Sequence, residues 1–123
     1  MRRILVVDDS PLIQSMLRIL IARRLPEYQA TIVTNGQEAL QHINSRGAPD
    51  LILLDVNMPV MDGLTFMEHL RAAGLVEKVP VIIVSTEGKE EDVLRGLEAG
   101  AKGYLRKPFR AEDLYAIVKK ILP

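Results

Sequence analysis

Acidic residues stand where two short apolar runs of the chain end. Ile4-Leu5-Val6-Val7 is followed by Asp8 and Asp9, and Leu51-Ile52-Leu53-Leu54 is followed by Asp55. A carboxylate taken out of water at the end of a buried segment is costly unless a partner pairs with it or uses it. Neighbouring carboxylates also raise one another's pKa values unless a cation lies among them. The spacing therefore predicts an acidic site that holds a cation.

Polar residues of complementary chemistry follow the other apolar runs. These residues are Asn57, two positions after Asp55; Ser85, Thr86 and Glu87, after Val81-Ile82-Ile83-Val84; and Lys107 with Pro108, after Gly103-Tyr104-Leu105. A carboxylate nucleophile, a hard metal ion, a lysine and a hydroxyl are together the parts that transfer a phosphoryl group. Magnesium is the expected ion, because it takes oxygen ligands and often uses one or two carboxylates with phosphate oxygens.

A zinc site is not expected at these positions. The chain has no cysteine, and its two histidines, His42 and His69, fall within predicted helices rather than at the ends of apolar runs. Zinc and most transition metals use thiolate or imidazole ligands, so the donor set favours a hard cation.

The apolar runs and the segments between them indicate the elements that position these residues. Four runs are rich in β-branched residues, with a weaker fifth, and their continuous apolar character is typical of strands covered on both faces. The predicted strands are 4–7, 30–33, 51–54, 81–84 and 103–105. The segments between and after them have helical period, and the predicted helices are 11–24, 36–45, 63–73, 89–99 and 111–122.

Local signals support the helix ends. Ser10 precedes Pro11 as a helix N-cap, and Asp62 does the same for the helix that begins at 63. Glycines at 47, 74 and 100 stand where three of the helices should stop.

The strand–helix order occurs five times, which predicts an α/β fold with a parallel sheet, helices on both faces and right-handed crossovers. We expect one domain over residues 1–123, because no linker, repeat or low-complexity stretch interrupts the pattern. In such sheets ligands bind beyond the carboxyl ends of the strands, which is where the polar residues described above fall.

Composition narrows the class of protein. The 123 residues are 48% hydrophobic, and 16 Lys and Arg balance 16 Asp and Glu. The zero net charge gives no argument for nucleic-acid binding or a membrane surface. The apolar stretch near the N-terminus is too short for an export signal, and no run reaches the length of a transmembrane helix. We expect a soluble cytoplasmic protein that binds neither nucleic acid nor membrane directly.

Each candidate residue also has an ordinary structural explanation. A single aspartate after a strand is most often a loop charge or a cap, Ser85-Thr86 could cap the next helix, and Lys107-Pro108 is an ordinary turn. Tyr104, taken alone, is expected to be a half-buried aromatic residue of the core. The functional interpretation depends on their coincidence, because all of them fall at one edge of one predicted sheet.

Together these residues resemble the receiver domains of bacterial response regulators, and the single-domain CheY-like chemotaxis regulators most closely. The resemblance covers the whole chain and is carried by Asp8-Asp9, by LLDVNMPVMDG around Asp55, by Ser85 and by KPF at 107–109. It implies a flavodoxin-like (βα)5 fold with strand order 2-1-3-4-5. It also implies a phosphorylation switch of a two-component system rather than an enzyme, one that catalyses only its own phosphorylation and dephosphorylation.

The resemblance assigns roles to individual residues. Asp55 is the phosphoryl acceptor. Asp9 and Asp55 bind magnesium directly, Asp8 acts mainly through a water on the metal, and the backbone carbonyl of Asn57 completes the protein ligands.

Further roles concern the transferred group and the signal. The resemblance implies that Lys107 contacts the phosphoryl group through its amine, next to a cis peptide bond to Pro108. Ser85 moves to bond the phosphoryl group, and Tyr104 turns inward into the vacated space. The expected partners are a histidine kinase or its phosphotransfer domain, and a target protein that binds the face formed by helix 4, strand 5 and helix 5.

The chain departs mildly from the family pattern at two positions. Ser85 stands where threonine is commoner, and Thr86 stands where the family usually has a smaller residue. The β-branched Thr86 beside the acceptor is expected to slow the entry of phosphodonor or water.

Three other functions fit parts of the pattern less well. A phosphatase of the haloacid dehalogenase kind needs an aspartate two residues after its nucleophile, where this chain has Asn57, and a cap domain for which 123 residues leave no room. A flavodoxin-like cofactor carrier needs a phosphate cradle after the first strand, where Asp8-Asp9 would repel a phosphate. A degenerate receiver that works without phosphorylation is disfavoured by the intact acidic set.

Overall fold

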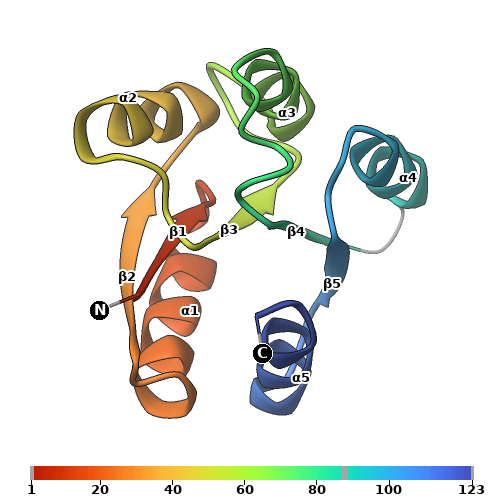
Figure 1. Ribbon diagram of the computed structural model, residues 1–123. Coiled ribbons are helices and arrows are strands. Elements are labelled where there is room, and N and C mark those ends of the chain that lie inside the picture. Colours follow the sequence, from red (N-terminus) through yellow and green to blue (C-terminus); the bar gives the residue numbers. More distant parts are fainter. Residues whose placement is uncertain (1, 87–88, 123) are drawn as a thin grey trace.

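Five parallel strands form the sheet at the centre of the protein, in the order β2-β1-β3-β4-β5 (Figure 1). The computed structural model describes residues 2–86 and 89–122. The strands are β1 (Arg2–Val7), β2 (Tyr28–Val33), β3 (Leu51–Asp55), β4 (Val81–Thr86) and β5 (Gly103–Lys107). The predicted strand order and α/β class are therefore confirmed, and the three central strands carry the most apolar runs of the chain.

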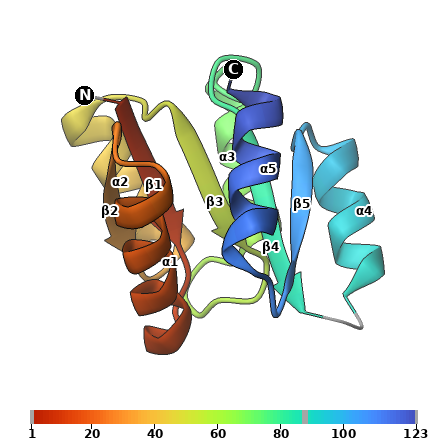
Figure 2. The same ribbon diagram turned by 90° about the horizontal axis from the view of Figure 1, so that it is seen from below.

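The helices lie on both faces of the sheet. They are α1 (Pro11–Arg24), α2 (Gly36–Arg46), α3 (Gly63–Ala72), α4 (Glu90–Glu98) and α5 (Ala111–Ile121). Helices α2, α3 and α4 cover one face, and α1 and α5 cover the other (Figures 1 and 2). Parallel strands need helical crossovers of this kind, so both faces of the sheet are buried.

Successive residues of each central strand supply two separate cores. Leu5, Val7, Ile52 and Leu54 pack on the side of α2 and α3, whereas Ile4, Val6, Leu51 and Leu53 pack on the side of α1 and α5. Side chains of a strand alternate between the faces of the sheet, so a strand buried on both faces must be apolar at every position. For this reason the strand sequences are continuous apolar runs and do not alternate between apolar and polar residues.

Side-chain caps set the helix starts that the sequence predicts. Ser10 Oγ accepts a hydrogen bond from the Ile13 amide, and Asp62 Oδ1 accepts one from the Thr65 amide at 2.8 Å. Asn35 caps α2 in the same way through the Glu38 amide, which the sequence analysis did not identify. The three glycines predicted to end helices follow α2, α3 and α4 and all have positive φ values.

The strands extend further than predicted at their carboxyl ends. Ser85 and Thr86 are the last residues of β4, and Lys107 is the last residue of β5, so these three do not follow their strands as expected. The pairs Ser85–Arg106 and Thr86–Lys107 continue the β4–β5 ladder. Ser85 and Thr86 also do not cap α4, whose N-cap residue is Lys89 and has no side-chain cap bond. Glu87 lies outside the described residues.

No helix among the described residues is both long and apolar enough to cross a bilayer.

Candidate functional site

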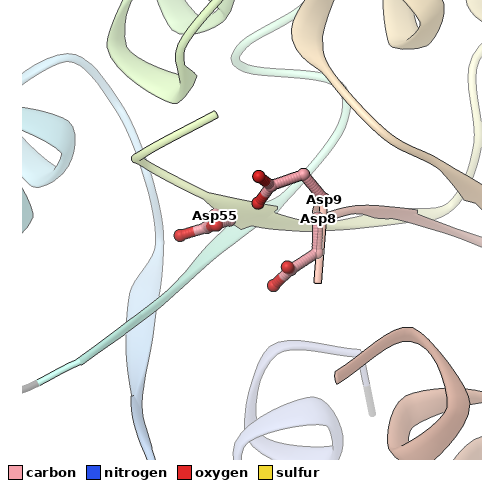
Figure 3. A group of neighbouring side chains, drawn as sticks. All are labelled: Asp8, Asp9 and Asp55. Atoms are coloured by element: carbon pink, nitrogen blue, oxygen red, sulfur yellow. The ribbon is translucent and has the colours of Figure 1, made fainter. Parts of the chain in front are cut away.

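Three carboxylates meet at the carboxyl end of the sheet. Asp8 and Asp9 follow β1, and Asp55 ends the neighbouring strand β3, so the three side chains are neighbours at this edge of the sheet (Figure 3). One oxygen atom from each carboxylate lies within 4.8 Å of the others. The arrangement places oxygen donors of three chain positions within reach of a single ion, as the sequence predicts.

Lys107 provides the positive charge that borders this group. Its Nζ atom lies 2.8 Å from Asp8 Oδ2 and 3.8 Å from Asp55 Oδ1. The peptide bond between Lys107 and Pro108 is cis, as the resemblance implies. One ammonium faces three carboxylates, so the described residues leave the site with an excess of negative charge.

The pKa of Asp55 shows the effect of this environment. Burial raises the pKa of the Asp55 carboxyl to about 6, with a further upward contribution from Asp8, while Lys107 and the Asn57 amide act to lower it. The Asn57 amide hydrogen points toward Asp55 Oδ1, at an N···O distance of 3.4 Å. A raised carboxyl pKa means that the ionised form lacks compensating charge. Because this donor set consists of carboxylate oxygens, a hard divalent cation fits the site.

The loop between β3 and α3 is tied to its surroundings at two glycines. The Gly63 amide donates to the Val56 carbonyl at 3.0 Å, and the Gly36 amide donates to the Met61 carbonyl at 3.1 Å. A Cβ atom at Gly63 would overlap the Asp55 carbonyl oxygen and lie 2.8 Å from the Val56 Cα. Helix α3 can therefore start against the end of β3 only because residue 63 has no side chain.

The tip of the same loop is a tight turn with an unusual residue. The Met61 amide donates to the Pro59 carbonyl at 2.7 Å, which closes a three-residue turn around Val60. Val60 has a φ value of 67° and is 76% exposed. A β-branched side chain rarely adopts positive φ, so this position carries backbone strain beside the acidic site.

Ser85 and Tyr104 lie on adjacent strands beside a cavity under α4. Ser85 is buried and its Oγ donates to the Thr86 carbonyl at 3.2 Å, whereas the side chain of Tyr104 is outside, with the residue 48% exposed. A cavity of about 220 Å³ opens between α4 and the strands. Its lining residues are Ser85, Thr86, Glu90, Val93, Leu94, Leu97, Tyr104 and Arg106. Tyr104 is thus an exposed residue in this structure and not the half-buried core aromatic of the ordinary explanation.

The structure brings the predicted residues of one edge together and leaves the histidines apart. Asp8, Asp9, Asp55, Asn57 and Lys107 lie together at the acidic site, with Ser85 one strand further along. His42 and His69 lie in α2 and α3, as expected.

Three contributors to this region were missed by the sequence analysis. Gln14 donates a side-chain hydrogen bond to the Asp8 carbonyl, Gly63 allows the close approach of α3, and Val60 has the strained turn. A polar Gln14 directly after the apolar residues Pro11, Leu12 and Ile13 at the start of α1 was the available signal.

Comparison with known proteins identifies relatives across almost the whole chain. Residues 4–119 match the response regulator receiver domain. The chain is 36% identical over 121 residues to the phosphate regulon transcriptional regulatory protein PhoB of Escherichia coli, covering 98% of this chain and 52% of PhoB. It is 42% identical to the transcriptional regulatory protein PrrA of Mycobacterium tuberculosis, covering 98% of this chain and 49% of PrrA. The chain therefore spans about half the length of these curated relatives.

Solved structures of similar length share the fold. A putative response regulator from Chloroflexus aurantiacus superposes with a TM-score of 0.88 at 34% identity, covering 98% of this chain and 97% of that one. The chemotaxis protein CheY4 of Vibrio cholerae gives a TM-score of 0.87 at 33% identity, covering 99% of both chains. The chain belongs to the response regulator receiver domains, the phosphorylation-activated switch domains of two-component systems.

Proposed function

We propose that Asp55 accepts a phosphoryl group from a histidine kinase or its phosphotransfer domain, with Mg²⁺ held by Asp8, Asp9, Asp55 and the Asn57 carbonyl. The observation that carries the proposal is the position of Asp55. It ends a fully buried strand, its carboxylate is grouped with two others, and Lys107 Nζ lies 3.8 Å away. We further propose that residues 1–123 act as one receiver domain.

The reaction is a transfer between two nucleophiles. One Asp55 oxygen attacks the phosphorus atom of the donor phosphohistidine, the P–O bond forms as the P–N bond breaks, and the imidazole leaves with the electron pair and takes up a proton. The aspartyl-phosphate is later hydrolysed by water. The domain accelerates these two steps only on itself, so it acts as a signalling domain rather than as an enzyme with an external substrate.

Residues around the acceptor favour the transfer by neutralising and orienting charge. Lys107 places a cation beside the oxygens of the incoming phosphoryl group, and the Ser85 hydroxyl offers a hydrogen bond to one of them. Bound Mg²⁺ would neutralise charge on the transferred group and on the carboxylates. Asp55 must be ionised to attack, and its pKa of about 6 leaves it ionised at neutral pH.

The signal leaves the site through Ser85 and Tyr104. A phosphoryl group on Asp55 offers Ser85 a charge-assisted hydrogen bond of about 1.5–3 kcal/mol. That is enough to bias two states that differ by a few kcal/mol. The cavity under α4 is lined by both residues, so the exposed Tyr104 ring has room beside it to move into. Burial of the ring would change the α4–β5–α5 face, where a downstream target protein binds.

The acceptor assignment is tested by labelling and mass mapping. Wild-type protein incubated with acetyl phosphate and Mg²⁺ should gain one phosphate, located on Asp55. Asp55→Asn should gain none, and Asp92→Asn in α4 serves as a matched control that should label normally. A phosphate mapped to a different residue, or normal labelling of Asp55→Asn, would contradict the proposal.

A dehalogenase-like phosphatase is the alternative function, because such an enzyme would also be phosphorylated on an aspartate in the labelling experiment. It would require a general acid two residues after Asp55, and that position holds the exposed amide side chain of Asn57. Multiple turnover of a phosphate ester that does not leave a phosphate on Asp55 at steady state would favour the phosphatase instead.

A further inference from the structure

Every polar group of Asp8 has a partner in this structure. Its amide donates to the Val33 carbonyl at 3.1 Å, and its Oδ1 accepts from the Ser10 amide at 2.9 Å. Its Oδ2 accepts from Lys107 Nζ at 2.8 Å. Its backbone carbonyl accepts from Gln14 Nε2 at 2.6 Å. Asp8 is 1% exposed, so these contacts fix both its side chain and its backbone.

Asp9 has no comparable support. It is exposed, and its carboxylate has no hydrogen-bond or ion-pair partner within residues 2–86 and 89–122. Its oxygen nevertheless lies within 4.8 Å of those of Asp8 and Asp55. The direction of the Asp9 side chain must therefore come from the backbone of the short segment that joins β1 to α1, residues 8–10.

Gln14 holds one atom of that backbone, the Asp8 carbonyl oxygen. The carbonyl of Asp8 belongs to the peptide unit that joins Asp8 to Asp9, and this unit is planar. The hydrogen bond to the Asp8 carbonyl oxygen therefore fixes the orientation of this peptide plane, which includes the Cα atom of Asp9. The Gln14 backbone is itself fixed, because its amide donates to the Ser10 carbonyl at 2.9 Å in the first turn of α1. The half-buried Gln14 side chain thus connects the helix to the peptide that orients Asp9.

We infer that Gln14 is a positioning residue for the acidic site: its side-chain amide holds the Asp8–Asp9 peptide so that the unsupported Asp9 carboxylate faces Asp55. The inference rests on the proposed function, since it assigns Asp9 a role in binding Mg²⁺. It deepens that function by adding a residue that touches neither the ion nor the phosphoryl group. The competing explanation is that Gln14 only ties α1 to the sheet.

The test replaces Gln14 by methionine, which has a similar length and shape but no hydrogen-bond donor. Mg²⁺ is titrated into each protein alone, and the amide chemical shifts of Asp9 and Asp55 are followed by NMR. Gln41→Met, on the exposed side of α2, is the matched control. Gln14→Ala is a second variant in case methionine packs poorly.

Loss of one neutral hydrogen bond predicts a Mg²⁺ dissociation constant raised between about twofold and tenfold in both Gln14 variants. The metal-free spectrum should show the largest shift change at Asp9, and Gln41→Met should match the wild type. In phosphorylation by acetyl phosphate, the Mg²⁺ concentration for half-maximal rate should rise, with the rate at saturating Mg²⁺ within about twofold of wild type.

The outcomes separate this inference from the proposed function. Unchanged Mg²⁺ affinity in both folded Gln14 variants, with only a lower melting temperature, would show that Gln14 is structural and would overturn the inference. Failure of wild-type Asp55 to accept phosphate while Mg²⁺ binding depends on Gln14 would overturn the proposed function and leave the positioning role standing. A wild type with no affinity for Mg²⁺ would overturn both.

Discussion

Lys107 forms its short ion pair with Asp8 and not with Asp55. The Nζ–Oδ2 distance to Asp8 is 2.8 Å, against 3.8 Å to Asp55 Oδ1. Both side chains are almost fully buried, and a buried pair that loses one partner leaves an uncompensated charge. Lys107 thus compensates the buried charge of Asp8 while its amine remains 3.8 Å from the Asp55 carboxylate.

Replacing Lys107 by methionine should separate these two roles. The metal-free protein should lose about 3 kcal/mol of unfolding free energy because buried Asp8 becomes unpaired. Added Mg²⁺ should raise the melting temperature of this variant more than that of the wild type, since the cation would then neutralise all three carboxylates without help. Phosphorylation by acetyl phosphate should slow at least about tenfold, because a charge near the transferred group is lost.

Lys102→Met, at an exposed position before β5, is the control for the Lys107 change. It should leave all three measurements unchanged. Equal stability of Lys107→Met and wild type would contradict the structural role assigned to the Asp8 pair.

The raised pKa of Asp55 predicts a pH-dependent cost to folding. The folded-state pKa is about 6, mainly through burial, against an ordinary value of 3.8 for a free aspartate carboxyl. The folded protein therefore binds more protons than the unfolded chain between these values, and stability falls as the pH rises through this window. Below it both states are protonated and the cost is absent.

Asp55→Asn should remove this cost. In EDTA at pH 7.5 the variant should be more stable than wild type by roughly 1–3 kcal/mol, and at pH 4 the difference should nearly vanish. Denaturant unfolding at several pH values measures both. A stability difference that is constant with pH, or largest in acid, would show that ionised Asp55 is not the source.

A side chain at position 63 is expected to disturb the backbone of Asp55. In Gly63→Ala the new methyl group would overlap the Asp55 carbonyl oxygen, and backbone cannot yield as a flexible side chain does. The variant should lose about 1–3 kcal/mol of stability. Its folded fraction should also take phosphate more slowly, because the backbone of Asp55 and Val56 must move.

Gly74→Ala is the matched control for Gly63. Gly74 has a φ of 73°, but no atom lies within 4 Å of the point where an alanine methyl group would stand, so its cost of about 1 kcal/mol comes from the backbone alone. This control should label at the wild-type rate. Similar labelling rates for the two variants, each corrected for the folded fraction, would argue against a role of Gly63 in positioning Asp55.

Replacing Val60 by glycine is expected to stabilise the protein, because Val60 has a positive φ value. Positive φ at a non-glycine residue costs about 1–3 kcal/mol, and its exposed side chain contributes little packing. Val60→Gly should raise the unfolding free energy by about 1 kcal/mol after the added backbone entropy of glycine is counted. Val60→Ala keeps the Cβ atom and should gain less. Thermal or urea unfolding of the three proteins gives the order, and a destabilised Val60→Gly would be inconsistent with strain at this turn.

Ser85 and Tyr104 are expected to change conformation together when a phosphoryl analogue binds at Asp55. With beryllofluoride and Mg²⁺, the exposed fraction of the Tyr104 side chain should fall from its present half-exposed state, and its rotamer should change. Ser85→Ala should weaken that change while Asp55 still accepts phosphate. Tyrosine-specific NMR signals and labelling of Asp55 measure the two effects separately. A Tyr104 ring that keeps its rotamer and exposure would mean that the signal travels by another route.

Periodicity and residue type were enough to determine the order of the elements and the polar set at the strand ends. Buried parallel strands require unbroken apolar runs. Leu51–Leu54 and Val81–Val84 could therefore be predicted as strands without knowing which strands they pair with. Because the carboxyl ends of such strands share one edge, Asp8, Asp55 and Lys107 could be placed together in advance. The family pattern then supplied the expected roles.

The tertiary structure alone decided which of these residues touch. Strand ends depend on the pairing partner, so Ser85, Thr86 and Lys107 became part of the β4–β5 ladder. Lys107 lies 1.0 Å closer to Asp8 than to Asp55, at 2.8 Å against 3.8 Å, and these residues stand at the ends of three different strands, β5, β1 and β3. No linear pattern encodes such a difference, because it follows from the twist and packing of the whole sheet.

The same limit applies to the local details of the site. The bond of Gln14 to the Asp8 carbonyl, the overlap that excludes a side chain at Gly63, and the positive φ of Val60 each depend on where segments distant in the chain come to lie. Residue types restrict such contacts, but distances between packed elements select among them. The sequence by itself determined the chemistry available at the edge of the sheet, and the fold determined which atoms of that chemistry meet.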